Sequence, residues 1–157
     1  MTKEAKIMND DHLESAFSVA KKFCELSGWS ITNLKLQKII YLTHMVYMGR
    51  NSGLGLVEEP FQAWMYGPVQ SELYHKLKAF GDKPVLNVFD NVEDVCPEHE
   101  EYIGTAYSSL GKVDGWKLVE ITHRKQSAWS KTYEKGNSSK IIPDELIIEE
   151  YKAYFSE

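Results

Sequence analysis

The sequence predicts a mainly α-helical fold: a compact bundle of about six to seven helices around a buried central helix, with a small β element near residues 60–66. Two patterns predict the helices, since apolar residues recur at three- and four-residue intervals and capping residues or glycines bound these stretches. The third observation is size, because 157 residues with 43% hydrophobic side chains suffice for one ordinary core. We therefore expect a polar tail at residues 1–11 and a single domain at residues 12–157.

The first two helices are predicted from their apolar residues and from the residues that bound them. An apolar stripe runs from Leu13 to Ser27, and Gly28 is well placed to end that helix. Thr32 or Asn33 can cap the second helix. Apolar residues then cover most of its circumference, which predicts a central, buried helix. They are Leu34, Leu36, Ile39, Ile40, Leu42, Met45, Val46 and Met48.

The middle of the chain is predicted to pass from an extended segment into another helix. Phe61, Ala63 and Met65 occupy alternate positions within residues 60–65, which is typical of a short strand. Pro68 suits the first turn of a new helix, because its missing N–H costs nothing there. The buried face of that helix is predicted to carry Val69, Leu73, Leu77 and Phe80.

Residues 82–101 are the least regular part of the sequence. Pro84 and Pro97 bracket a segment that is rich in Asp and Glu, although some of its apolar residues can anchor it to the core. It is interpreted as a solvated acidic face, and a role in contacting a basic partner stays open. Three more helices are predicted after it: from Tyr102 to Gly111, after Asp114, and from residues 143–144 onwards.

Charge and composition restrict the class of function. The net charge is −5 and the sequence pI is about 5.6, whereas proteins that bind nucleic acid usually carry a Lys/Arg surplus. We therefore expect no direct contact with nucleic acid. Residues 1–11 have no apolar core of a signal peptide, and no apolar run approaches the length of a membrane span. The expectation is a cytoplasmic protein with no membrane contact.

We expect no cofactor, no metal and no catalytic residue. The five histidines form no His-x-x-x-His pair, and Cys24 and Cys96 belong to no paired metal or redox spacing. The sequence has no phosphate-loop pattern and no Gly-x-Ser-x-Gly. His44 is interpreted as a core histidine with a hydrogen-bond partner. A hydrolase that uses His123 remains an alternative without a supporting nucleophile–base spacing.

Four segments together resemble the Panacea, or SocA-like, antitoxin domain family, a phage-associated family. They are TNLKLQKIIY at residues 32–41, FQAWMYGPV at residues 61–69, ITHR at residues 121–124 followed by Ala128-Trp129, and Ile142 with Tyr154-Phe155. The sequence departs from the family pattern at Ala128, where the family usually has Pro, and in its long acidic stretch at residues 82–101.

The resemblance implies an antitoxin that neutralises a cognate protein toxin, encoded nearby, by direct contact. It also implies an alternative, a proteolytic adaptor that delivers a bound client to a cellular protease. Neither role requires chemistry from this chain, so the resemblance predicts a binding surface and no enzyme activity.

The same segments supply the candidate site residues. Those expected to hold the structure are Leu36, Gln37, Tyr41, Trp64, Gly67 and Pro68. Those considered for partner contact are Lys35, Lys38, Tyr66, His123 and Trp129. Four of these residues also have a structural interpretation. Lys35 and Lys38 can mark the solvent edge of the central helix, with Gln37 binding backbone groups of residues 64–68, and His123 with Trp129 can hold the turn between two helices.

Overall fold

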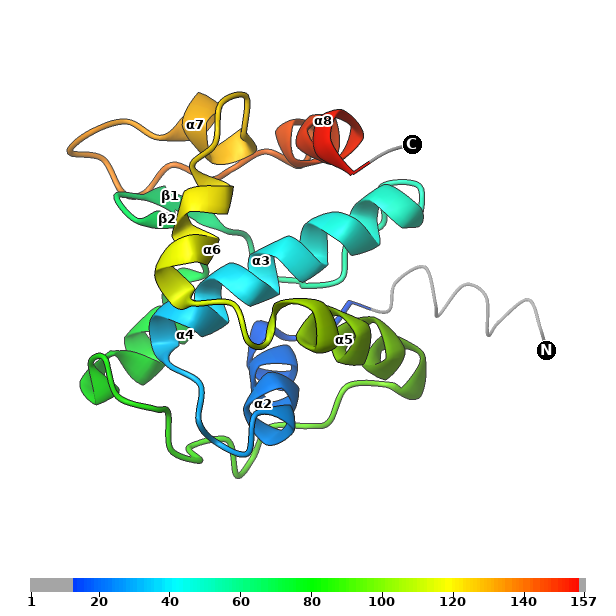
Figure 1. The fold of residues 1–157 in the computed structure, drawn as a ribbon, viewed down its shortest axis with the longest axis vertical. Coiled ribbons are helices and arrows are strands. Elements are labelled where there is room, and N and C mark those ends of the chain that lie inside the picture. Colours follow the sequence, from blue (N-terminus) through cyan, green and yellow to red (C-terminus); the bar gives the residue numbers. More distant parts are fainter. Residues whose placement is uncertain (1–12, 156–157) are drawn as a thin grey trace.

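The computed structural model describes residues 13–155, and the predicted mainly α-helical fold is confirmed (Figure 1). The predicted tail at residues 1–11 lies outside the described residues, as do residues 12, 156 and 157. Seven α-helices accompany a two-stranded antiparallel sheet within the part described. The helices are α2 (Ala16–Leu26), α3 (Asn33–Arg50), α4 (Ser71–Leu77), α5 (Pro97–Leu110), α6 (Gly115–Thr122), α7 (Ala128–Thr132) and α8 (Asp144–Tyr154). A 3-10 turn, η1 (Lys78–Phe80), and the strands β1 (Gln62–Trp64) and β2 (Gly67–Val69) complete the elements.

Helix α3 is the buried central helix that the sequence predicts. It packs against α2, α5, α6, α8 and β2, and most of its residues are buried. In Figure 1 it crosses the middle of the molecule, with α2 and α5 on one side and α7 and α8 on the other. The Thr32 side chain caps it by accepting a hydrogen bond from the Lys35 backbone N–H at 3.3 Å.

Two helix boundaries differ from the prediction. Helix α5 begins at Pro97, inside the segment that was expected to be irregular. A proline in the first turn and acidic side chains near a helix N-terminus both favour this start. Helix α7 was not predicted, because five residues are too few to show a period. Ser127 caps it by accepting a hydrogen bond from the Ser130 N–H at 3.0 Å.

The predicted helix start at Pro68 is wrong. Pro68 lies in β2 opposite Ala63, and α4 begins at Ser71 with the Gln70 side chain as its cap. The Ala63 N–H donates away from β2, to the Lys140 carbonyl at 2.9 Å. Residues paired in this way direct their backbone groups away from the partner strand, so a proline there costs no bond between the strands.

The expected helical face after Pro68 is therefore shorter than predicted. Val69 is buried in β2, whereas Leu73 and Leu77 are buried on α4 as expected. The β element predicted near residues 60–66 consequently extends to Val69.

Side chains of α3 bind the open edge of β2. The Lys38 amine donates to the Pro68 carbonyl, with 2.9 Å between Nζ and O. The Gln37 side-chain oxygen accepts from the Gln70 backbone N–H at 2.8 Å. On the opposite side of the hairpin, residues 140–142 bind β1. An isolated two-stranded hairpin is marginally stable, and these contacts satisfy both of its edges.

Gly67 is the point where the hairpin comes closest to the helices behind it. Its φ is +112°, which L-residues with a side chain rarely adopt. A Cβ at this position would lie 2.8 Å from Thr122 Oγ1 and 3.0 Å from Lys38 Cε. Both observations require glycine here.

Gly67→Ala is expected to lower the free energy of unfolding by about 2–4 kcal/mol, because it adds backbone strain and a close contact. Gly104→Ala on α5 is the matched control. Among the described residues, nothing lies within 4 Å of its added Cβ, and alanine favours helix by about 0.5–1 kcal/mol. Urea denaturation measures both variants. Equal stability of Gly67→Ala and the wild type would contradict the close packing of the hairpin.

Candidate functional site

Lys38 does not mark the solvent edge of α3, which corrects the sequence-based expectation. Its side chain is 1% exposed and its amine binds Pro68, whereas Gln37 binds Gln70 and not residues 64–68 as expected. Lys35, three residues earlier, is only partly buried and donates to the Gly111 carbonyl. Lys38 therefore positions the hairpin and is not accessible for a partner.

Burial also changes the protonation of this region. It lowers the pKa of Lys38 to about 7, since water no longer solvates the ammonium group. Burial, followed by the nearby charge of Lys38, lowers the pKa of His123. Both shifts disfavour positive charge behind the hairpin.

His123 and Trp129 hold the turn between α6 and α7, in agreement with the structural interpretation of this pair. Their rings stack with centroids 3.7 Å apart and an interplanar angle of 5°. The Trp129 indole N–H donates to the Trp64 carbonyl at 2.6 Å, which ties α7 to β1. Trp64 itself packs edge-on against Tyr74, with centroids 4.9 Å apart. This arrangement makes Trp64, His123 and Trp129 part of the scaffold.

Glu150 connects the last helix to the same turn. It is buried on α8 and accepts hydrogen bonds from the Ala128 N–H at 2.9 Å and from Arg124 Nε at 3.0 Å. Burial raises the pKa of Glu150 above its usual value, and the bonds from Ala128 and Arg124 partly offset this effect. Helix α8 is thereby fixed to α6 and α7.

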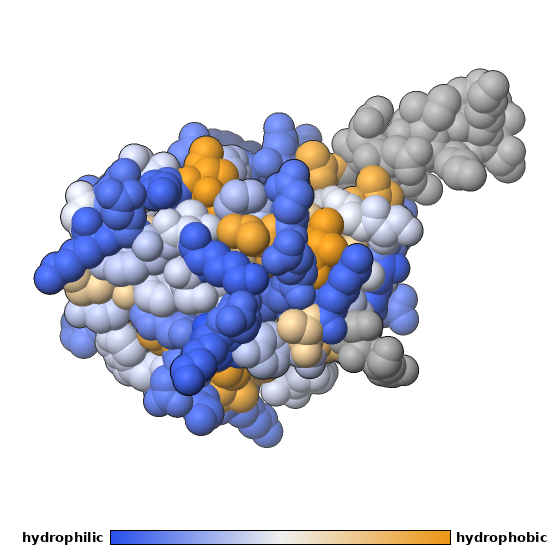
Figure 2. Space-filling view, turned by 90° about the horizontal axis from the view of Figure 1, so that it is seen from above, coloured by the Kyte–Doolittle hydropathy of each residue, from blue (hydrophilic) through white to orange (hydrophobic). Residues whose placement is uncertain are grey.

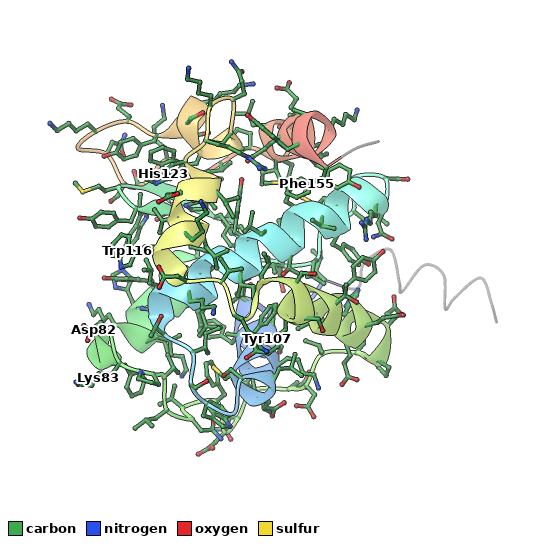
Figure 3. All side chains as sticks on the ribbon, in the orientation of Figure 1. Asp82, Lys83, Tyr107, Trp116, His123 and Phe155 are labelled. Carbon is green, nitrogen blue, oxygen red and sulfur yellow. The ribbon has the colours of Figure 1, made fainter. Side chains whose placement is uncertain are left out.

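Tyr66 and Trp116 form an exposed aromatic pair at the tip of the hairpin. Their rings meet edge to face at 5.4 Å, and the residues are 53% and 55% exposed. Met65 beside them is also exposed. Figure 3 places Trp116 and His123 along α6 at one side of the molecule, away from Phe155 at the end of α8. We call Met65, Tyr66 and Trp116 the hairpin patch.

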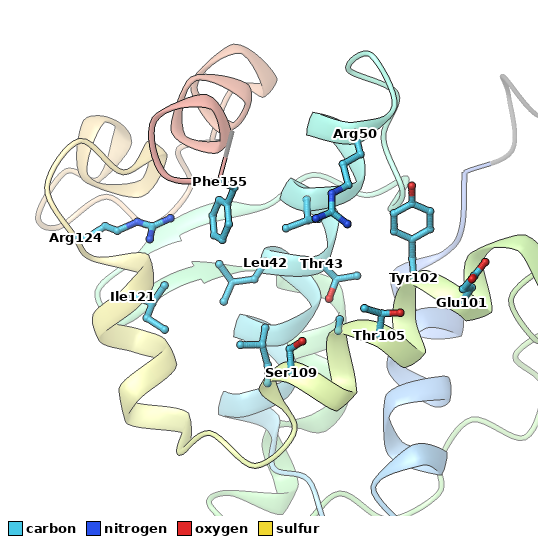
Figure 4. A pocket seen from close by; sticks show the side chains of 13 residues that line it. Leu42, Thr43, Arg50, Glu101, Tyr102, Thr105, Ser109, Ile121, Arg124 and Phe155 are labelled. Carbon is cyan, nitrogen blue, oxygen red and sulfur yellow. The ribbon is translucent and has the colours of Figure 1, made fainter. Parts of the chain in front are cut away.

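A groove of about 600 Å³ opens between α3, α5, α6 and the end of α8 (Figure 4). Most of its lining is apolar, and small side chains on α5 leave the space unfilled. The lining residues are Leu42, Thr43, Val46, Arg50, Glu101, Tyr102, Thr105, Ala106, Ser109, Leu110, Ile121, Arg124 and Phe155. Seen from the end that carries α7 and α8, the surface is otherwise mostly hydrophilic, with hydrophobic residues gathered in small patches (Figure 2).

Arg124 gives the groove a cation that is only partly satisfied. Its guanidinium binds Glu150 through Nε and stacks over Tyr154, 3.7 Å from the ring centroid. Its Nη2 is buried and has no hydrogen-bond partner within residues 13–155. Arg50, also in the lining, is exposed.

Other residues of the predicted central helix lie in the core. Leu36 and Tyr41 are fully buried, and the Tyr41 ring meets Phe61 edge to face at 5.2 Å. His44 is a core histidine, as expected. Its Nδ1 accepts a bond from the Val57 N–H at 3.1 Å, and burial lowers its pKa to about 4.

Comparison with known proteins identifies the family. The family profile described as the antitoxin SocA-like, Panacea domain matches residues 36–130. This chain belongs to the SocA-like Panacea family. The antitoxin SocA of Caulobacter vibrioides (strain NA1000 / CB15N) is 27% identical over 110 residues, which cover 63% of this chain and 58% of SocA. The match thus spans less than two thirds of that relative. No solved structure matches the chain.

The Panacea segments contribute mainly to the scaffold. Residues 36–130 include most of α3, the hairpin and the stacked turn, which hold one another in place. Of the five residues considered for partner contact, Tyr66 is well exposed, Lys35, His123 and Trp129 are partly buried, and Lys38 is buried. Within the described residues, no helix has the length and apolar composition to cross a membrane.

The sequence analysis did not identify the groove. Leu42 and Val46 were expected in the core, and the residues from Tyr102 to Gly111 were expected only to form a helix. Small residues on the α5 face were the one available signal, but only the packing of α5 and α8 against α3 shows that they leave a space.

Lys38→Met is expected to change how stability depends on pH. The folded protein holds this pKa at about 7 and the unfolded chain near 10.5, so the unfolded state binds more protons between these values. The contribution of Lys38 to the free energy of unfolding therefore rises with pH through this window. Lys38 contributes at most roughly 1.4 kcal/mol for each pH unit.

Urea denaturation from pH 7 to pH 10 measures this difference. Lys38→Met should lose the rise, whereas Lys112→Met, which removes an exposed lysine, should keep it. The same pH dependence in Lys38→Met and the wild type would contradict a buried amine with a lowered pKa.

Proposed function

We propose that this chain is an antitoxin that binds a cognate protein toxin, encoded nearby, and neutralises it by direct contact in the cytoplasm. The observation that carries the proposal is the match of residues 36–130 to the SocA-like Panacea domain. The relative over that region is named an antitoxin, which supports the same role. Neutralisation by contact needs a complementary surface that covers the toxin's active site or excludes its target, and it needs no catalysis by this chain.

The groove is the surface that best suits such a contact. Interfaces derive most of their energy from apolar side chains placed in well-packed pockets, and this groove is largely apolar and open to solvent. Of the charged residues in its lining, Arg124 is paired with Glu150, which leaves Arg50 and Glu101 as one exposed positive and one exposed negative group. We therefore expect the toxin to insert an apolar helix or loop with polar side chains at its rim.

Thr105→Arg and Ser109→Arg are expected to abolish neutralisation, because each places a long charged side chain in the groove. Both positions are exposed on α5, so the variants should fold. The measurement is growth of cells that co-express the chain with the toxin-like product of the neighbouring gene. The affinity of the purified pair, measured by calorimetry, should fall at least about tenfold, or about 1.4 kcal/mol.

Ser108→Arg is the matched control for these variants. Ser108 is exposed on the same helix but does not line the groove, so the variant should protect cells as the wild type does. Undiminished binding by Thr105→Arg and Ser109→Arg would exclude the groove. A wild-type chain that neither binds nor protects against that product would contradict the antitoxin function itself.

A second candidate function is a proteolytic adaptor that delivers its client to a protease. The observation that favours it is the hairpin patch, because Met65, Tyr66 and Trp116 are exposed and lie outside the groove lining. An adaptor needs two surfaces, one for the client and one for the protease. Exposed aromatic residues are frequent energetic centres of protein contacts. Lys35 would border this second surface, and His123 with Trp129 would support it from behind.

Tyr66→Ala combined with Trp116→Ala separates the two functions. For an adaptor, this double variant should still bind the client through the groove but should no longer lower the client's level in cells. Pulse-chase measurement of the client's half-life, with and without the chain, tests the point. A client whose half-life does not change with the wild-type chain would exclude the adaptor function and leave the antitoxin function standing.

A further inference from the structure

Glu14, Cys96 and His99 bring three potential metal ligands together where the chain leads into α2 and where α5 begins. The ligand atoms, a carboxylate oxygen, a thiol sulfur and an imidazole nitrogen, lie within 4.8 Å of one another. His99 Nδ1 is 2.5 Å from Glu14 Oε2 and 3.2 Å from Cys96 Sγ. His99 stands two residues before Glu101 and three before Tyr102, which line the groove, so α5 carries residues of both sites.

The fold holds each of these side chains independently. The Glu14 N–H donates to the Leu56 carbonyl, and the Glu14 carbonyl accepts from the Glu58 N–H, both at 2.8 Å. Cys96 is the residue before the first turn of α5, and its backbone N–H donates to Glu14 Oε2 at 3.0 Å. His99, in that first turn, is 1% exposed. Three ligands held by the backbone need little reorganisation to bind an ion.

The surroundings of His99 match those of a metal-binding histidine. Such a histidine usually has its second ring nitrogen fixed by a hydrogen bond, which sets the orientation of the ring. Here Nδ1 faces Glu14 and Cys96, and Nε2 lies 3.1 Å from the Tyr47 hydroxyl. Because a hydroxyl can donate or accept, the ring can bind an ion through Nδ1 while Nε2–H donates to Tyr47.

A nucleophilic role for Cys96 fits the same geometry poorly. In a cysteine–histidine catalytic pair, one ring nitrogen takes the thiol proton and the other is held by an orienting group. Here Glu14 and Cys96 both face Nδ1. Burial, followed by hydrogen bonding to Glu14, raises the pKa of the Cys96 thiol to about 11, so the reactive thiolate is not the resting form.

We propose that Glu14, Cys96 and His99 form a zinc-binding site with water as the fourth ligand. Zinc accepts sulfur, nitrogen and oxygen ligands together, and three protein ligands with one open position are a known arrangement. Neighbouring ligands around tetrahedral zinc lie about 3.3–3.6 Å apart. The distance between Sγ and Nδ1 already approaches this range, and the carboxylate has to move outwards from 2.5 Å to about 3.3 Å.

Zinc would enter this site by replacing protons. The thiol has to lose its proton to become a ligand, and Nδ1 has to offer its lone pair, so affinity rises with pH. Cys96 is only partly buried, which gives an ion access from solvent. The bound ion would join residues 85 positions apart in sequence and fasten the start of α2 to the start of α5. It would stabilise the fold.

Cobalt titration tests the site directly, because Co²⁺ occupies zinc sites and gives a near-ultraviolet thiolate-to-cobalt absorption band. The full chain is first stripped with a chelator and transferred to chelator-free buffer. We expect a band that saturates at one ion per chain, disappears on addition of equimolar Zn²⁺, and grows as pH rises. Cys96→Ala should lose it, whereas Cys24→Ala, which removes the other thiol, should keep it.

Zinc should also raise the Tm of the wild type and of Cys24→Ala, but not that of Cys96→Ala. Glu14→Gln should weaken cobalt binding at least about tenfold, since it removes a charged ligand. The proposal is overturned if the stripped wild-type chain gives no thiolate band. It is also overturned if Cys96→Ala gives the same band as the wild type. Neither measurement requires a toxin, so the outcome is independent of the proposed antitoxin function.

Discussion

The hydrogen bond from the buried Lys38 amine to the Pro68 carbonyl is the contact on which the rest of this structure depends. A two-stranded hairpin leaves the outer edge of each strand unpaired, and unpaired backbone groups are costly when buried. Helix α3 resolves this for β2 with two polar side chains, Gln37 and Lys38, that take the place of a third strand. Burial at this edge lowers the pKa of the amine to about 7, so the neutral amine predominates above that pH.

Further contacts connect the hairpin to α7 and α8. Strand β1 presents the Trp64 carbonyl to Trp129, which stacks on His123 and fixes the turn into α7. The N-terminus of α7 and the nearby Arg124 then bind Glu150 of α8. Because α8 ends beside α3 and α5, its position sets one wall of the groove. The residues of the family pattern therefore act on the binding surface through the scaffold, and most of them do not line it.

Most of the helices could be predicted from the sequence, but the binding surfaces could not. Helical periods and caps, such as Thr32 and Asp114, predict α2, α3, α5 and α6 because these signals are local. The helix start predicted at Pro68 was wrong because a proline suits both the first turn of a helix and a strand position whose backbone groups point away from the partner strand. Only the pairing of Pro68 with Ala63 distinguishes the two. The burial of Lys38 could not be predicted from the sequence either, because a lysine at a helix edge is usually solvated.

The groove and the metal cluster show the same limit. Each is formed by residues far apart in sequence, and their proximity depends on how the helices pack. One local signal of the cluster was missed in the sequence, because His99 stands only three residues after Cys96. The third ligand, Glu14, comes from before α2 and required the tertiary structure.

Amide hydrogen exchange of the chain, alone and bound to the toxin-like product of the neighbouring gene, tests the central claim most directly. If the hairpin is scaffold and the groove is the binding surface, binding slows exchange along α5 and at the end of α8, and leaves residues 62–69 unchanged. Slower exchange confined to residues 65–66 and 115–117, with none in α5, would contradict this division of roles.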